Sequence, residues 1–323
     1  MNKTKNGIQT GLGSCRYFKP RSTTDKSELA MFLARTLITA DVKRYVMFLS
    51  TGRSGHSWIG SVLDAAPNAL VANEYGAFEK FRNERRQMTQ DSLFEGLAKN
   101  SFMCGKYGRI QVYDYSIPGL WQGKIGNGQV IDVIGDKMGG STVEVLRSFG
   151  DPWEDKGAAE AQQKFLQDFR DMVKVPLRVV VVVRNPFNMI ATNHLRGGWK
   201  GKEIPSSSVQ MELNKYRQII WASENLFEPE EVHTMTMESF ATDTETQLRS
   251  LCEFVPIQCP SKMIEIVNNK THHTPHATYK LAQWREDQVT VLNDYIEKHL
   301  SQYGYQPVPN WVKEEREKAD TKH

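Results

Sequence analysis

Apolar runs of strand length alternate with amphipathic stretches along most of this chain. The clearest run is LRVVVVVR at 177–184, whose unbroken β-branched residues are typical of a strand buried on both faces, as in the middle of a parallel sheet. Shorter runs predict further strands at 45–50, 69–74, 129–136 and 231–238. Because helical patterns separate these strands, the sequence predicts a three-layer α/β fold around a central parallel sheet.

The helical patterns fit the same layout. Helices are expected at 27–39, 56–66, 141–149, 157–174, 208–226, 240–254 and 280–301, with another that begins near Pro186. Ligands of such folds bind at the carboxyl ends of the strands. The residues that follow the predicted strands are therefore the first candidates for a functional site.

The layout predicts a single domain at 27–305, flanked by a flexible polar leader at 1–26 and a polar tail at 306–323. Within it, residues 75–128 mix charge, glycine and aromatic side chains and are expected to form a variable insert. Its aromatic residues, expected to shape a substrate pocket, are Tyr107, Tyr113, Tyr115 and Trp121.

Composition narrows the class of partner. The formal net charge of +3 over 323 residues is too small to indicate nucleic acid or an anionic membrane as a bulk partner, although it allows a local basic pocket. No stretch approaches the roughly 20 apolar residues of a membrane span. The best candidate, at 29–40, is short and contains Arg35, so an amphipathic helix is expected there. The sequence leaves monomer and homodimer open.

The four cysteines fit no metal-binding or redox spacing, which favours a reducing compartment and a cytoplasmic location. Cys252 and Cys259 are close enough in sequence to pair, but buried free thiols are the expectation. The cluster of His272, His273 and His276 suggests zinc, yet no cysteine ligand accompanies it. A flexible loop that covers a ligand is the preferred interpretation.

The stretch STGRSGHSWIG at 50–60 links a predicted strand to a predicted helix, an arrangement that presents backbone N–H groups to a phosphate. It differs from the loop of nucleotide hydrolases, because His56 stands where their lysine would be when Ser57 takes the final hydroxyl position. The most buried strand ends in Arg184 rather than in a magnesium-binding aspartate. Asp136 does end a strand, so a metal site stays open.

The loop resembles the 5′-phosphosulfate loop of sulfotransferases that use 3′-phosphoadenosine 5′-phosphosulfate (PAPS). Cytosolic members carry a Lys-Ser-Gly-Thr-Thr-Trp type sequence where this chain has RSGHSW at 53–58. The resemblance is closer to the tyrosylprotein sulfotransferases. Their loop leads into a helix ending Leu-Asp-Ala-His-Pro and then to a strand end with a glutamate, matched here without a gap by RSGHSWIGSVLDAAPNALVANEY.

A second signature lies about 130 residues further on. In VVVVVRNPFNMIATNHLR, an arginine, a proline and a hydroxyl residue follow the strand, as in the segment with which this family binds the 3′-phosphate. A weaker likeness is IGDKMGG between the two, and the C-terminal third also follows the family's rhythm. The resemblance spans about residues 45–305 without 75–128, and it implies the P-loop-like sulfotransferase fold.

The resemblance implies a role for each residue around the sulfate. The backbone N–H groups of the loop would hold the 5′-phosphate, and Arg53 would stabilise the bridging oxygen as the S–O bond breaks. Glu74 would be the general base and Lys137 would hold the transferring group. The alternatives are a surface ion pair for Arg53, a structural carboxylate for Glu74 and a strand-end lysine for Lys137. The loop residues in question are Ser54, Gly55, His56 and Ser57.

For the 3′-phosphate, the resemblance implies Arg184 and Thr192, with Arg196 one turn further along the helix. Trp58 matches the tryptophan that cytosolic members stack on adenine, although a core position is the alternative. Lys270 or Lys280 would lie near the 3′-phosphate in the loop over the nucleotide. Two departures from the family pattern have no assigned role: His56 replaces a threonine, and Asn185 replaces an acidic residue.

Together these observations predict an enzyme that transfers the sulfuryl group of PAPS, without a metal, to a hydroxyl or amine of a small molecule such as a secondary metabolite. The sequence shows neither a membrane anchor nor a signal segment, which favours a small-molecule acceptor over a tyrosylprotein or carbohydrate acceptor. The alternatives of another class are a P-loop kinase and a non-catalytic nucleotide-binding protein.

Overall fold

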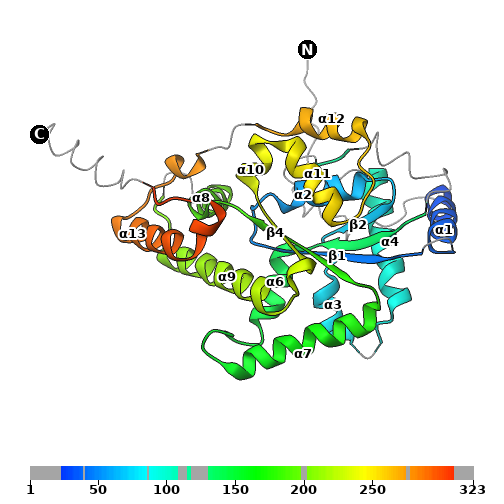
Figure 1. Ribbon diagram of the computed structural model, residues 1–323, viewed down its shortest axis with the longest axis horizontal. Coiled ribbons are helices and arrows are strands. Elements are labelled where there is room, and N and C mark those ends of the chain that lie inside the picture. Colours follow the sequence, from blue (N-terminus) through cyan, green and yellow to red (C-terminus); the bar gives the residue numbers. More distant parts are fainter. Residues whose placement is uncertain are drawn as a thin grey trace, which may run out of the picture.

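The computed structural model describes residues 23–38, 41–85, 87–107, 115–117, 130–197, 202–273 and 277–308. Its centre is a five-stranded sheet with the order β2-β3-β1-β4-β5, in which every neighbouring pair is parallel (Figure 1). The strands are β1 (Arg44–Ser50), β2 (Ala69–Asn73), β3 (Val133–Lys137), β4 (Leu177–Val183) and β5 (Val232–Thr236). All five carboxyl ends therefore lie along one edge, as the sequence predicts.

Helices cover both faces of the sheet. One apolar cluster joins the sheet to α2, α10, α11 and α12, and the other joins it to α1, α3, α4, α6, α7, α8, α9 and α13. Figure 1 shows α2, α10, α11 and α12 on one side of the sheet and α3, α6, α7 and α9 on the opposite side. The predicted three-layer α/β architecture is confirmed.

The helix bounds are α1 (Thr23–Ile38), α2 (His56–Ala65), α3 (Ala77–Glu84), α4 (Gln90–Tyr107), α6 (Gly139–Arg147), α7 (Lys156–Val173), α8 (Pro186–Arg196), α9 (Ser206–Asn225), α10 (Met237–Thr242), α11 (Thr244–Phe254), α12 (Ser261–Lys270) and α13 (Glu286–Tyr295). Short 3-10 turns lie at Pro229–Glu231, Thr278–Leu281 and Ser301–Tyr303, and a π-helical turn at Ile296–Leu300 follows α13. Among all the residues that the structure describes, no helix is long and apolar enough to cross a membrane.

The central strands are buried on both faces because helices pack against each. In β4, every residue except Arg178 is buried, which confirms the interpretation of the valine run. Gly135 allows β3 to lie close to β1, since a Cβ at that position would be 2.0 Å from the Val46 carbonyl oxygen. A larger residue at position 135 would therefore push β1 and β3 apart.

Three predicted elements differ in detail. The strand expected at 129–136 begins at Val133, and the helix expected at 240–254 is divided at Asp243, which caps α11 by accepting from Thr246 N–H. The C-terminal helix begins at Glu286 rather than 280. The leader before Thr23 and the tail after 308 lie outside the described residues.

The expectation of free thiols at Cys252 and Cys259 is wrong. The two residues form a disulfide between the end of α11 and the turn that follows it, with Cα atoms 6.2 Å apart. A separation of seven residues across a reversing turn brings the two Cβ atoms within bonding range. Disulfides persist mainly in oxidising compartments, so this bond argues against the reducing compartment that the cysteine spacing favours.

Candidate nucleotide and catalytic site

The turn at 51–55 leads from the carboxyl end of β1 into the N-terminus of α2. Arg53 and Gly55 both have left-handed backbone conformations, with φ of 69° and 94°. Gly55 is the N-cap of α2, and no side chain caps the helix there. The first-turn N–H groups and the positive end of the helix dipole therefore face the carboxyl edge of the sheet, an arrangement that suits an anion.

Gly55 is required for its size as well as its backbone conformation. A Cβ at this position would lie 2.2 Å from the Sδ atom of Met237, at the start of α10. The close approach of α10 fixes the turn from the outside. The turn between β1 and α2 therefore packs against the Met237 side chain at the start of α10.

His56 has a role that the sequence did not reveal. Its ring is buried, and its Nδ1 lies 3.0 Å from the Ser54 hydroxyl, whose side chain is fully buried. Burial, together with the positive charges of Lys137 and Arg53, lowers the pKa of His56 to about 3. The imidazole is therefore neutral at physiological pH and holds the turn through Ser54, whereas a lysine at this position would add a charge.

The neutrality of His56 predicts an acid-sensitive stability. The unfolded chain takes up a proton at His56 below its ordinary pKa of 6.5, whereas the folded chain does so only near 3, so the free energy of unfolding falls as pH falls through this window. Between pH 7 and pH 5 the loss is about 2 kcal/mol. Urea denaturation at both pH values should show a loss that is larger in the wild type than in His56→Asn by about this amount, because partial burial also lowers the pKa values of His233 and His299 in both proteins. The same pH dependence in both proteins would contradict the assignment.

Lys137 contacts both the predicted phosphate loop and Glu74, the candidate general base. It is the last residue of β3, its side chain is fully buried, and its Nζ lies 3.1 Å from both Ser57 Oγ and Glu74 Oε1. The Glu74 side chain is 26% exposed, so it faces the open edge of the sheet while Lys137 lies behind it. A buried cation therefore contacts the loop hydroxyl and the carboxylate at once.

Gly60 creates the space through which Lys137 reaches these partners. A Cβ at Gly60 on α2 would lie 2.3 Å from Cγ and 2.7 Å from Cβ of Lys137. Position 60 is one helical turn after position 57, so the lysine runs along this face of α2 toward the loop. Neither the composition nor the motif spacing indicated this contact.

A substitution at Gly60 tests this arrangement. A glycine-to-alanine change in an exposed helix stabilises a protein by about 1 kcal/mol. Gly60→Ala is expected instead to destabilise by about 1–3 kcal/mol, because the new methyl group overlaps Lys137 and must displace it. Thermal and urea denaturation measure the sign. A variant more stable than the wild type would show that Lys137 does not take this path.

Asp136 positions Glu74 and is not exposed for a metal. Its carboxylate accepts hydrogen bonds from the backbone N–H groups of Tyr75 (3.0 Å), Gly76 (2.8 Å) and Ala77 (2.8 Å), at the N-terminus of α3. Glu74 itself has φ of 58° and donates its N–H to the Lys137 carbonyl. The turn that carries the candidate base is therefore fixed by the end of β3. No group of three or more metal-ligating side chains occurs among the described residues.

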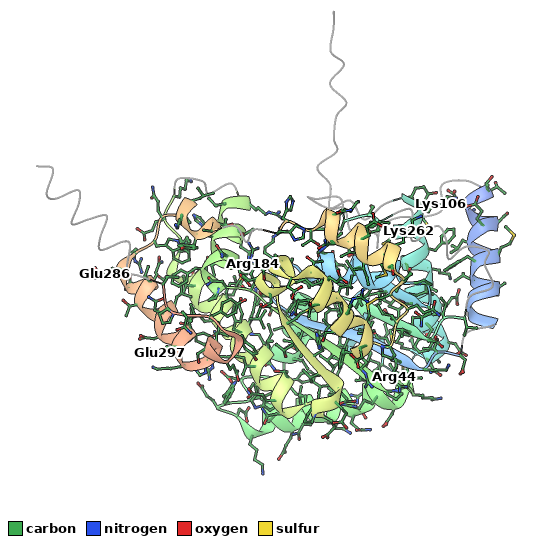
Figure 2. The ribbon with its side chains drawn as sticks, turned by 45° about the horizontal axis from the view of Figure 1, so that its top comes forward. Arg44, Lys106, Arg184, Lys262, Glu286 and Glu297 are labelled. Atoms are coloured by element: carbon green, nitrogen blue, oxygen red, sulfur yellow. A yellow bond between two sulfur atoms is a disulfide. The ribbon has the colours of Figure 1, made fainter. Side chains whose placement is uncertain are left out.

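Arg184 follows β4 and contacts the loop directly. Its guanidinium donates to the Arg53 carbonyl at 2.9 Å, and its own carbonyl accepts from the Tyr216 hydroxyl on α9. Figure 2 shows Arg184 at the end of the sheet opposite to Arg44, the first residue of β1. The two segments predicted to bind the nucleotide, 131 residues apart, thus meet at one edge.

Asn185 has a structural role where the family carries an acidic residue. Its side chain caps α8 by accepting from the N–H groups of Phe187 and Asn188. Its own N–H donates to Glu238 at 3.1 Å, and the same carboxylate accepts from the Tyr305 hydroxyl. Glu238 and Tyr216 therefore fix the Arg184 turn. Sequence reasoning missed both, although Glu238 lies two residues after β5, a position that could have indicated it.

Thr192 and Arg196 lie further along α8, on the helix that Arg184 precedes. The Thr192 hydroxyl donates to the Asn188 carbonyl at 2.6 Å, so its proton becomes available to a phosphate oxygen only after the hydroxyl rotates. Arg196 is the last residue of α8 and is half-buried. The structure places both residues on α8, the helix of the predicted 3′-phosphate signature.

Trp58, Lys270 and Lys280 border the same region. The Trp58 indole N–H donates to Thr271 Oγ1 at 3.3 Å, which ties α2 to the end of α12. Lys270 donates to the Ser116 carbonyl at 2.9 Å, and Lys280 is exposed in the 3-10 turn Thr278–Leu281. The adjacent Tyr279 N–H donates to Asn188 Oδ1 on α8. Thr271 therefore contacts α2, whereas Tyr279 contacts α8.

The histidine cluster of the sequence is only partly within the described residues. The two ring nitrogens of His273 lie 3.2 and 2.9 Å from the carbonyl oxygens of Ala241 and Asn268. They are thus engaged with the backbone rather than directed at a shared ligand. His276 lies outside the described residues, as do Tyr113 and Trp121 of the predicted pocket.

Comparisons with known proteins found no matching family model and no matching curated protein. Solved structures similar to the chain are sulfotransferases. One is STF9 from Mycobacterium avium (13% identity, TM-score 0.44, covering 87% of this chain and 83% of that chain). Another is a sulfotransferase from Alicyclobacillus acidocaldarius (14%, 0.42, 84% and 99%). A third is mouse SULT7A1, complexed with PAP (10%, 0.38, 86% and 91%). These values are too low to assign an activity, which has to be argued from the residues of the site.

Proposed function

We propose that this protein transfers a sulfuryl group from PAPS to a hydroxyl or amine of an acceptor. The observation that carries the proposal is Lys137, a buried cation in contact with both the hydroxyl of the phosphate loop and the only carboxylate of the predicted site, Glu74. A phosphate-binding turn, a base and a cation between them are the groups that sulfuryl transfer needs. Arg53 and Arg184 add two further positive charges.

The phosphate loop would hold the 5′-phosphate of PAPS. The N–H groups at the start of α2 donate to its oxygens, and Arg53 neutralises charge on the oxygen that bridges phosphorus and sulfur. Arg184 would bind the 3′-phosphate, because a guanidinium can donate two parallel hydrogen bonds to it. Trp58, fixed to Thr271, would lie beside the adenine.

The chemistry needs one proton acceptor and one stabilised leaving group. The acceptor oxygen or nitrogen attacks sulfur, its proton passes to the Glu74 carboxylate, and a new bond to sulfur forms. The bond between sulfur and the bridging oxygen breaks, and its electron pair stays on the phosphate of adenosine 3′,5′-bisphosphate. Lys137 pairs with Glu74 before the reaction, and its position next to Ser57 lets it donate to the departing phosphate.

The proposed acceptor is a small molecule with a hydroxyl or amine, bound on the open side of Glu74. Tyrosyl side chains of proteins and carbohydrates are the alternatives. The sequence favoured a small-molecule acceptor over these two alternatives. The disulfide between Cys252 and Cys259 makes the alternatives stronger candidates, because it fits an oxidising compartment in which secreted acceptors occur. Acceptor panels therefore have to contain all three classes.

Calorimetric titration distinguishes this function from a P-loop kinase, whereas the alternative of a non-catalytic nucleotide-binding protein is distinguished by an assay of sulfuryl transfer. The wild type should bind adenosine 3′,5′-bisphosphate without magnesium and more tightly than Mg-ATP. His56 is uncharged at the position of the kinase lysine, and Asp136 uses both carboxylate oxygens on backbone N–H groups, so neither supports Mg-ATP. Magnesium-dependent ATP binding without bisphosphate binding would establish the kinase alternative and end this proposal.

A further inference from the structure

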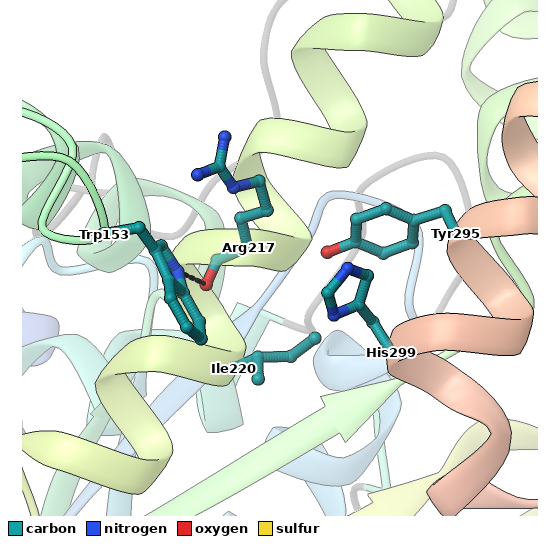
Figure 3. A pocket seen from close by; sticks show the side chains of 5 residues that line it. All are labelled: Trp153, Arg217, Ile220, Tyr295 and His299. Atoms are coloured by element: carbon teal, nitrogen blue, oxygen red, sulfur yellow. Dashed lines mark hydrogen bonds between the residues drawn. The ribbon is translucent and has the colours of Figure 1, made fainter.

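A second pocket lies away from the strand ends, between α9 and α13. It has a volume of about 330 Å³ and is lined by Trp153, Arg217, Ile220, Tyr295 and His299 (Figure 3). Small-molecule sites begin at about this volume, so the pocket suits a molecule of one or two rings. None of these five residues belongs to the candidate site described above. The neighbour of Arg217 on α9, Tyr216, faces the sheet and contacts Arg184 instead.

The walls of the pocket are flat rings held in place. The Trp153 indole N–H donates to the Arg217 carbonyl at 3.3 Å, which fixes one wall although the ring is half exposed. The Tyr295 and His299 rings are 4.7 Å apart and inclined by 41°, and they form the opposite wall. Figure 3 shows Ile220 at the base between the two walls. The pocket therefore presents rigid aromatic and aliphatic surface to an occupant.

The Tyr295 hydroxyl supplies one unused polar group. The exposed fraction of Tyr295 is 9%, and its hydroxyl has no hydrogen-bond partner among the described residues. Figure 3 shows this hydroxyl directed into the space between Arg217 and Ile220. A buried donor without an acceptor is unfavourable, so an occupant with an acceptor at this point would satisfy it.

The charges around the pocket favour a neutral occupant. The Arg217 guanidinium is paired with Asp151 at 3.4 Å and with Glu154 at 3.5 Å, so two carboxylates already compensate its charge. Glu224 on α9 and Lys298 beside His299 act on this side with opposite signs. An anion would compete with the two carboxylates for Arg217, and a cation would meet the arginine itself.

We propose that this pocket binds a neutral, planar aromatic molecule of one or two rings that carries one hydrogen-bond acceptor. Its ring lies between Trp153 and the Tyr295–His299 wall, and its acceptor receives the Tyr295 hydroxyl proton. The site does not depend on the sulfuryl-transfer proposal, since no nucleotide-site residue takes part in it. A molecule of this size is expected to bind with a dissociation constant on the order of 1 mM.

The probe for this site is 1-indanone, a planar bicyclic ketone, with indane as its hydrocarbon match. The readout is the Ile220 δ1-methyl resonance in isoleucine-methyl-labelled protein, assigned by its loss in Ile220→Val. 1-Indanone should shift this resonance in a saturable manner, because an aromatic ring stacked above Ile220 changes its magnetic environment. Indane should bind about three- to tenfold more weakly, since it lacks the acceptor.

Two variants and one control complete the test. Tyr295→Phe should make 1-indanone bind as weakly as indane, and Trp153→Ala should remove the saturable shift for both probes. Val291→Ala, an exposed change on the same helix as Tyr295, should leave both affinities unchanged. An unshifted Ile220 resonance in the wild type would overturn the site, and equal 1-indanone affinity in Tyr295→Phe would overturn the acceptor assignment.

Discussion

Glu74→Gln is expected to slow sulfuryl transfer by about 10²–10⁴-fold, the usual contribution of a general base, while nucleotide affinity changes by less than about twofold. Glutamine keeps the shape of the side chain and an oxygen for the Lys137 ammonium, which lies 3.1 Å away in the wild type. It has no carboxylate to take the acceptor's proton. Single-turnover rates and calorimetric affinities, measured on the same preparations, separate the two effects.

Glu79→Gln is the matched control for this prediction. Glu79 lies in the first turn of α3, five residues after Glu74, and accepts a hydrogen bond from Ser141. Its substitution should leave both the rate and the affinity as in the wild type. A full transfer rate in Glu74→Gln would remove the base assignment, and a lost nucleotide affinity would instead give Glu74 a structural role through Lys137.

Arg184→Ala is expected to weaken binding of adenosine 3′,5′-bisphosphate by about 10–100-fold. The change removes the charge-assisted interaction with the 3′-phosphate, worth about 1.5–3 kcal/mol in total. It also removes the donor to the Arg53 carbonyl, so the phosphate loop loses one of its supports. Titration with adenosine 5′-monophosphate beside the bisphosphate isolates the first effect, because the monophosphate lacks the 3′-phosphate.

The difference between the two nucleotides decides this prediction. In the wild type the bisphosphate should bind more tightly than the monophosphate, and in Arg184→Ala the two should bind nearly alike. Arg178→Ala on the same strand is the control, because Arg178 lies at the opposite end of β4 and donates to the Phe254 carbonyl. A preference for the bisphosphate that persists in Arg184→Ala would place the 3′-phosphate elsewhere.

The elements predicted from the sequence were those with a strong local signal. The valine run of β4 could only be a buried strand, and Gly55 followed by a helix pattern located the α2 N-terminus within one residue. No element was predicted at the position of α12, between the helix expected at 240–254 and the loop expected around His272–His276. Its signal was present, since Pro260 begins a stretch in which Met263, Ile264 and Val267 form one apolar face.

The sequence indicated that three of the candidate residues lie near one another, but it did not indicate the contacts between them. Parallel strands bring Glu74, Lys137 and Arg184 to one edge, so their neighbourhood followed from the topology. Their hydrogen bonds depend on side-chain paths that no motif encodes, such as the passage of Lys137 past Gly60. The neutral state of His56 likewise results from burial and from charges on β3 and in the loop, not from its neighbours in sequence alone.

The state of the cysteines could not be predicted from the sequence. Cysteine spacing without a metal or redox pattern favoured free thiols, but pairing depends on the distance between Cβ atoms, which the turn after α11 determines. The same limit applies to Asp136, which the sequence left open as a metal ligand. Its carboxylate instead holds three backbone N–H groups of the turn that carries Glu74.

The most direct test of the account is transfer of radiolabelled sulfur from PAPS to an acceptor by the wild-type chain without added metal. The acceptor panel contains small hydroxyl and amine compounds, tyrosyl peptides and oligosaccharides, with Glu74→Gln as the matched inactive protein. The account predicts that label appears in one class of acceptor, with one adenosine 3′,5′-bisphosphate formed for each sulfuryl group transferred. Label that stays on the nucleotide with all three classes, or equal transfer by Glu74→Gln, would contradict it.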